Sequence, residues 1–175
     1  MSVQKPALYT VQQVANFFLD KGREENIPIT QMKLIKIVYF AYGWVLAITG
    51  KRLFSEAIEA WKHGPVVSEL YHEFKCWGNN PIEHGSRTCN DDTGKVYLKR
   101  IPPNEDNDIH KILDAVWDTY KEFSPWQLRE KSHEKDSPWH KVYEEGEYNI
   151  QIEDYHIRCY FFKELGLAEE LNRFC

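Results

Sequence analysis

Histidine and carboxylate side chains gather in one stretch of the chain, which reads H-E-K-D from His133 and reaches a second histidine at His140. Side chains of this kind bind zinc when two histidines lie one helical turn apart, as in the pattern H-E-x-x-H. Here the histidines lie seven positions apart, and Pro138 stands between them. We therefore predict a loop of solvated and hydrogen-bonded side chains, with no metal site and no cofactor.

Sequence patterns of common catalytic and nucleotide-binding sites do not occur in the chain, which has no G-x-S-x-G, no Walker A sequence and no G-x-G-x-x-G. Cys76 stands beside Trp77 near an expected helix end, and Cys159 stands in an aromatic stretch. Both positions are typical of structural thiols rather than of nucleophiles. We expect no catalytic residue and a protein that is not an enzyme.

Two lysines three positions apart, Lys33 and Lys36, interrupt an otherwise apolar helix that we predict for residues 30–49. In one interpretation the helix is half-buried, and the long aliphatic parts of both side chains carry the ammonium groups into solvent. In the other they border a groove and donate to carboxylates or carbonyls of a partner. The same choice, between a structural wedge and a partner anchor, applies to Trp61, His63, Trp126 and Trp139.

Charge is spread unevenly along the chain. The net charge is −5, but residues 1–102 carry +3 and residues 103–175 carry −8. This balance argues against direct binding of nucleic acid, because an acidic surface repels phosphate. A partner that meets the C-terminal half is expected to be basic or neutral.

The compartment and the number of domains follow from length and composition. At 175 residues one domain over residues 1–175 is expected. The four cysteines lie far apart and no secretory signal opens the chain, so we expect free thiols. The longest uncharged apolar run, residues 37–48, is shorter than the ~20 residues that a bilayer requires. We predict a cytoplasmic protein with a buried core helix and no membrane contact.

Apolar residues recur at helical spacing over most of the chain, which predicts a mainly α fold. Thr10 and Gln13 form a capping-box pattern for the first helix, and Gly50 should end the second. The pair Gly64-Pro65 predicts the start of a third helix, because proline is favoured at the first helical position. Further helical segments are predicted around 109–120, 125–131, 137–139 and 152–165, with an added turn over 167–174.

Residues 80–103 break the helical pattern. Clusters of asparagine, aspartate, glycine and proline mark turns there, and residues 96–101 have β character. We predict a small irregular or β-hairpin insertion in a compact helical domain.

Three stretches, in this order, resemble the Panacea-domain family of SocA-like antitoxins, which are also described as phage-associated proteins. From residue 32 the chain reads M-K-L-I-K-I-V-Y-F-A-Y-G-W, similar to the family's L-K-L-Q-K-L-L-Y-F-A-x-G-W, with Met32 and Ile35 as departures. From residue 59 it reads E-A-W-K-H-G-P-V-V. The third stretch combines Leu128, the letters S-H-E from residue 132 and Pro138-Trp139. The resemblance covers about residues 8–165, and the segment 89–101 looks longer than in many members.

The resemblance implies a domain that binds and neutralises a co-encoded protein toxin and, in the SocA-like branch, delivers it to a protease. The acidic C-terminal half would shield a basic toxin surface. No room precedes the domain for a helix-turn-helix, so direct DNA binding is not expected. We expect partner contacts from Lys33, Lys36, Tyr39, Trp61, His63, Tyr71, His133 and Trp139. Structural roles are expected for Gly64, Pro65 and Pro138.

Two alternatives stay open at this point. A regulatory protein of a phage or mobile element would bind a host factor in place of a toxin. A hydrolase would use His63, His133 and Glu134 in a pocket near Trp61. A toxic gene beside this one would favour the antitoxin.

Overall fold

The computed structural model describes residues 6–89, 91, 93–103 and 107–167 of the chain. The strands form two antiparallel pairs, β1 with β2 and β3 with β4. This content confirms a mainly α fold with a small β insertion. In chain order the elements are α1 (Val11–Glu24), α2 (Gln31–Thr49), β1 (Ile58–Trp61), β2 (Gly64–Val67), α3 (Ser68–Phe74), a 3₁₀ turn (Lys75–Trp77), β3 (Arg87–Cys89), β4 (Val96–Leu98), α4 (Asn107–Tyr120), α5 (Pro125–Ser132), α6 (Pro138–Val142) and α7 (Asp154–Glu164).

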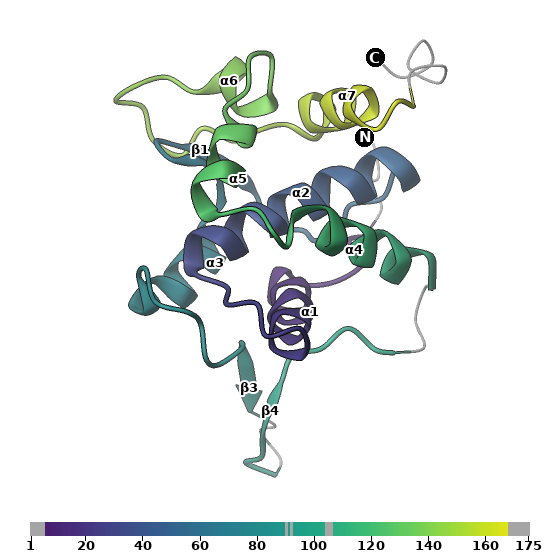
Figure 1. Ribbon diagram of the computed structural model, residues 1–175, viewed down its shortest axis with the longest axis vertical. Coiled ribbons are helices and arrows are strands. Elements are labelled where there is room, and N and C mark those ends of the chain that lie inside the picture. The colour runs from purple at the N-terminus through teal and green to yellow at the C-terminus, as the bar shows by residue number, and fades with distance from the viewer. Residues whose placement is uncertain (1–5, 90, 92, 104–106, 168–175) are drawn as a thin grey trace.

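Helix α2 runs through the middle of the molecule, and helices from both halves of the chain cover it (Figure 1). It contacts α1, α4, α5 and α7. Fourteen of its nineteen residues are buried, as expected for a helix that is apolar on nearly every side. By length and composition α2 could also cross a membrane, but 78% of its most apolar window is buried inside the structure, as in a core helix.

Helix ends lie where their capping residues predict them. Thr10 accepts a hydrogen bond from the Gln13 backbone N–H at 3.3 Å, and the Gln13 side chain accepts one from the Thr10 N–H at 2.9 Å. Ser124 and Gln127 form a second capping box at α5. Gly50 ends α2 in the left-handed conformation, with φ at 67°. These local rules satisfy backbone groups that helix ends leave unpaired.

The third predicted helix begins later than expected. Residues 58–67 form the hairpin β1–β2, in which Ala60 faces Pro65 and Trp61 faces Gly64. Helix α3 begins only at Ser68. The prediction that Gly64-Pro65 starts a helix is therefore wrong, and strand β1 is an element that the sequence pattern did not reveal.

The reason lies in the hydrogen bonds of the hairpin. The Ala60 N–H, opposite Pro65, donates to the Ile150 carbonyl on the other side of β1 at 2.8 Å. Proline is tolerated in a strand where no donor is required of it. The β-branched Val66 and Val67 that follow favour an extended backbone over a helical one.

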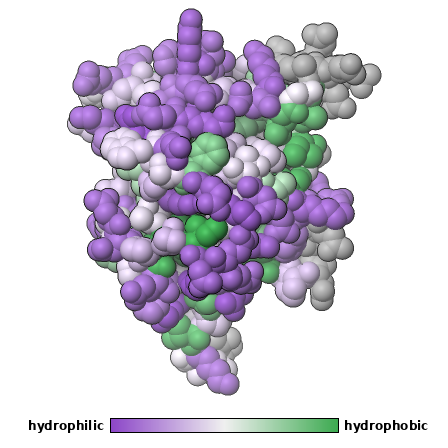
Figure 2. Space-filling model, in the orientation of Figure 1, coloured by the Kyte–Doolittle hydropathy of each residue, from purple (hydrophilic) through white to green (hydrophobic). Residues whose placement is uncertain are grey.

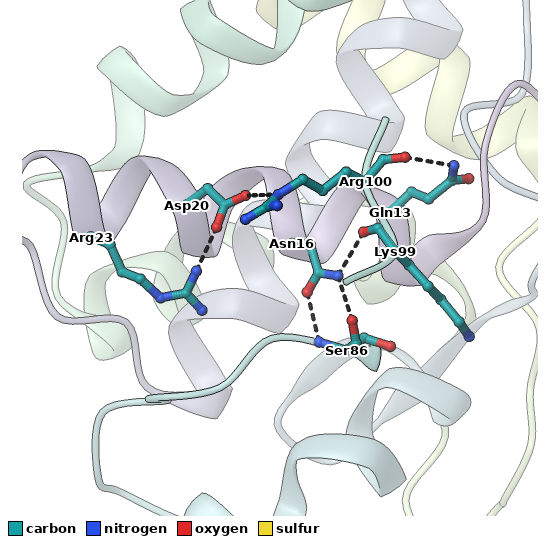
Figure 3. A network of polar contacts seen from close by, with 7 residues as sticks. All are labelled: Gln13, Asn16, Asp20, Arg23, Ser86, Lys99 and Arg100. Atoms are coloured by element: carbon teal, nitrogen blue, oxygen red, sulfur yellow. Dashed lines mark hydrogen bonds and ion pairs between the residues drawn. The ribbon is translucent and has the colours of Figure 1, made fainter. Parts of the chain in front are cut away.

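The predicted insertion contains the hairpin β3–β4, which projects from one end of the molecule (Figure 1). Its base is fixed to α1 by Asn16, which is 1% exposed. The Asn16 amide donates to the carbonyls of Ser86 at 2.8 Å and Lys99 at 2.6 Å and accepts from the Ser86 N–H at 2.7 Å (Figure 3). Arg100 adds an ion pair with Asp20 at 2.9 Å. A buried amide with these partners satisfied holds the insertion in one place.

The structure corrects the expectation for one cysteine and leaves most of the last predicted turn outside the described residues. Cys76 and Cys89 form no disulfide, but Cys159 is disulfide-bonded, so the expectation of free thiols is wrong there. Wide spacing in sequence does not prevent a disulfide when folding brings two cysteines together. The turn predicted over 167–174 lies, beyond residue 167, outside the described residues.

Lys36 joins α2 to the hairpin β1–β2 from the inside of the protein. Its side chain is 1% exposed, and its Nζ donates to the Pro65 carbonyl at 2.9 Å. Burial, with a smaller effect from the positive charge of Arg129, lowers the pKa of Lys36 to about 7. The hairpin is thus held by a buried amine whose charged form is disfavoured.

Gly64 allows the hairpin to reach this position. Its φ is +100°, a conformation that residues with a Cβ rarely adopt. A Cβ on Gly64 would lie 2.7 Å from Lys36 Nζ and 2.8 Å from both Ser132 Oγ and His133 Cε1. Hairpin, α2 and the end of α5 therefore meet at a point where an added side chain would be both strained and crowded.

Substitution Gly64→Ala should lower the free energy of unfolding by about 2 kcal/mol or more, because backbone strain and three close contacts act together. Gly94→Ala is the matched control, since Gly94 also has a positive φ, 65°, but no atom within 4 Å of the added Cβ. The control should lose only about 1 kcal/mol from strain. Equal losses in urea-induced unfolding would show that the contacts around Gly64 are not tight.

The buried amine predicts a pH dependence of stability. Because the folded pKa of Lys36 is lowered to about 7, the unfolded chain binds more protons above that pH. Stability should rise with pH between 7 and 9, with a contribution from Lys36 of up to about 1.4 kcal/mol per pH unit. Lys36→Met should remove this contribution, as measured by urea unfolding at several pH values. A variant with the wild-type slope would contradict the assignment.

Candidate functional site

A groove of about 180 Å³ opens at the turn of the hairpin β1–β2. The start of α2, the hairpin turn and α3 build it. The Trp61 and Tyr71 rings lie 4.9 Å apart between centroids, and Trp61 Nε1 donates to Glu59 at 2.8 Å. Both rings are half-buried, so part of their apolar area is exposed at the groove. The groove is lined by Gln31, Met32, Ile35, Lys36, Trp61, Lys62, His63, Val66 and Tyr71.

Four residues predicted to contact a partner, Lys36, Trp61, His63 and Tyr71, line this groove together. They come from α2, the hairpin and α3, which the sequence does not place side by side. His63 is exposed on the turn, and partial burial together with the charges of Arg129, Lys62 and Lys36 lowers its pKa. It is therefore mainly neutral near pH 7.

His133 and Trp139 form a second part of the same neighbourhood, behind the hairpin. Their ring centroids lie 3.8 Å apart, and Trp139 Nε1 donates to the Trp61 carbonyl at 2.8 Å. Pro138 is buried at the first position of α6, which Ser137 caps. Trp139 is 8% exposed, so it supports the hairpin more than it offers surface.

Two other predicted positions, Lys33 and Tyr39, lie inside the protein, and so does most of Lys36, which lines the groove from within. Lys33 is 6% exposed and donates to the Lys121 carbonyl, and Lys36 donates to Pro65 as described. Tyr39 is 2% exposed in the core. The interpretation of the lysines as exposed groups on a half-buried helix is wrong, because helices and the hairpin enclose α2 on both sides. Their donors serve carbonyls of this chain, and burial lowers the pKa of Lys33 as well.

A larger groove of about 490 Å³, also lined by Trp61 and Lys62, lies between β1 and residues 143–149. Its lining is aromatic and acidic, and sequence reasoning missed it. The sequence pattern that could have indicated this groove is the run Y-E-E-G-E-Y-N from Tyr143, which combines carboxylates with tyrosines. The lining consists of Ala60, Trp61, Lys62, Tyr143, Glu145, Gly146, Glu147, Tyr148 and Asn149.

The residues of the hydrolase alternative line two different grooves. His63 lines the small groove, whereas His133 and Glu134 line a separate groove of about 880 Å³ beside α4, α5 and α7. His133 Nδ1 lies 2.7 Å from the Arg129 carbonyl, and burial lowers its pKa. Glu134 accepts from the Tyr160 hydroxyl at 3.1 Å. Within the described ranges no group of three or more His, Cys, Asp or Glu side chains is arranged to hold a metal ion.

The arrangement thus offers half-buried aromatic rings, grooves and fixed turns, which suit binding of another macromolecule. Residues 34–140 match the family described as "Antitoxin SocA-like, Panacea domain". The chain is 35% identical to Antitoxin SocA of Caulobacter vibrioides (strain NA1000 / CB15N) over 136 residues, which are 78% of this chain and 71% of that protein. No solved structure matches the chain. The chain belongs to the Panacea-domain family of SocA-like antitoxins.

Proposed function

We propose that this antitoxin neutralises a co-encoded protein toxin by direct binding in the cytoplasm, and that it does so without catalysis. The observation that supports this proposal is the pair of grooves that share Trp61 and Lys62 in their linings. They combine residues from α2, the hairpin β1–β2, α3 and the 143–149 segment on one surface. Aromatic residues that are already partly packed lose little entropy on binding and are typical interface anchors.

Figure 2 shows the hydropathy of one face of the molecule. The face seen in Figure 2 is largely hydrophilic, with hydrophobic residues in small separate patches. Such scattered apolar residues are normal for protein surfaces. Nucleic acid is not the expected partner, because the net charge of −5 opposes phosphate binding.

Two finer questions depend on the partner. Delivery of the toxin to a protease rests on the family resemblance and would require a second contact. A regulatory protein that binds a host factor could use the same grooves, and only the identity of the bound protein separates it from an antitoxin. Co-expression with the gene that neighbours this one decides between them.

Trp61→Ala should weaken binding of the neighbouring gene's product by about 2 kcal/mol or more, chiefly through faster dissociation. Trp126→Ala is the matched control, because Trp126 is 59% exposed and lines neither groove beside Trp61. Surface plasmon resonance measures the rates, and circular dichroism checks that both variants fold. Equal affinity of the two folded variants would place the toxin elsewhere on the surface.

Glu134→Gln should leave protection of cells unchanged. Glu134 is exposed and is the carboxylate of the hydrolase alternative, so a catalytic role would not survive loss of its charge. The measurement is growth of cells that co-express the toxin with either form of the antitoxin. If the variant folds and binds the toxin but no longer protects, catalysis must be reconsidered.

A further inference from the structure

The groove between β1 and residues 143–149 is held in shape at both ends. At one end Tyr143 stacks on Trp139, with ring centroids 4.5 Å apart and planes 18° from parallel. At the other end the chain pairs with β1, since Ala60 donates to the Ile150 carbonyl and Ile152 donates to the Ile58 carbonyl, both at 2.8 Å. The groove therefore has fixed walls.

Carboxylates at this groove have no ion-pair partner in the part of the chain that the structure describes. Glu145 and Glu147 line it, Glu144 adjoins it, and all three are exposed. Among the described residues none of the three side chains forms an ion pair. The groove beside α5 differs in this respect, because there Lys131 pairs with Glu164 at 3.2 Å and lies 3.6 Å from Glu134. The groove between β1 and residues 143–149 therefore keeps its negative charge available to a partner.

Aromatic side chains complete the lining. Tyr148 is 85% exposed, and Trp61 and Tyr143 are half-buried. A positively charged side chain is attracted by the faces of such rings and by carboxylates beside them. Among the residues that the structure describes, Lys62 is the single basic one in the lining. Carboxylates and rings that converge on one groove therefore match a cationic side chain on an incoming chain.

We propose that this groove binds a basic, extended segment of the protein toxin and receives an arginine or lysine side chain between the rings and the carboxylates. This inference rests on the proposed function and names the chemistry of the partner at that surface. The small groove that shares Trp61 and Lys62 then takes the apolar residues that flank the basic side chain. A strand of nucleic acid would be repelled by the same carboxylates.

The experiment uses the intact protein and a short fluorescein-labelled peptide of alternating glycine and arginine as probe, with a glycine–glutamate peptide for comparison. Fluorescence anisotropy at low salt should show binding of the arginine peptide alone. The double variant Glu145→Gln/Glu147→Gln should weaken binding about tenfold, and Tyr148→Ala about threefold, since a ring contact contributes less than paired charges. None of these substitutions touches the core, so folding should be preserved.

The control is Glu73→Gln/Glu83→Gln, which removes the same charge from exposed positions outside the groove. It should bind the arginine peptide like the wild type. If it weakens binding as much as the groove variant, the attraction is unspecific and the proposal is overturned. Protection of cells separates the two claims: a groove variant that protects as well as the wild type contradicts the proposed contact, whereas a wild type that never protects contradicts the proposed function.

Discussion

Burial of α2 is the constraint on which the rest of this structure depends. A nineteen-residue helix that is apolar on nearly every side is stable in water only if other elements surround it. Helices α1, α4, α5 and α7 therefore converge on it from both ends of the sequence. Its two lysines, Lys33 and Lys36, are buried with it. Each donates a hydrogen bond to a backbone carbonyl, because an unpaired buried amine would be costly.

The same constraint positions the surface that we assign to the partner. Lys36 holds the Pro65 carbonyl, Gly64 lets the hairpin approach, and the hairpin in turn presents Trp61 to two grooves. Trp139 supports this arrangement from behind through the Trp61 carbonyl. A residue in the core, Lys36, and a residue at the surface, Trp61, are thus linked by a short chain of contacts.

Signals that act between neighbouring residues predicted much of the fold. The parts that depend on pairing between distant segments could not be predicted from the sequence. Capping boxes and periodic apolar residues predicted the helices near α1, α2, α4, α5 and α7, since these signals act within a few residues. Gly64-Pro65 gave a wrong prediction of a helix start, because glycine and proline occur both in strands and at helix starts. The extended conformation is set by the pairing of Ile150 with β1, far away in sequence. The buried lysines and the acidic groove could not be predicted, because both depend on which distant segments close over them.

Hydrogen exchange of the antitoxin, alone and with the product of its neighbouring gene, tests the central claim most directly, because it reports the contact surface without any substitution. The account predicts slower exchange of the amides of residues 61–71 and 143–149 in the complex, with little change in the hairpin β3–β4 at the opposite side of α1. Protection confined to β3–β4 or to α5, with residues 61–71 and 143–149 unchanged, would contradict it.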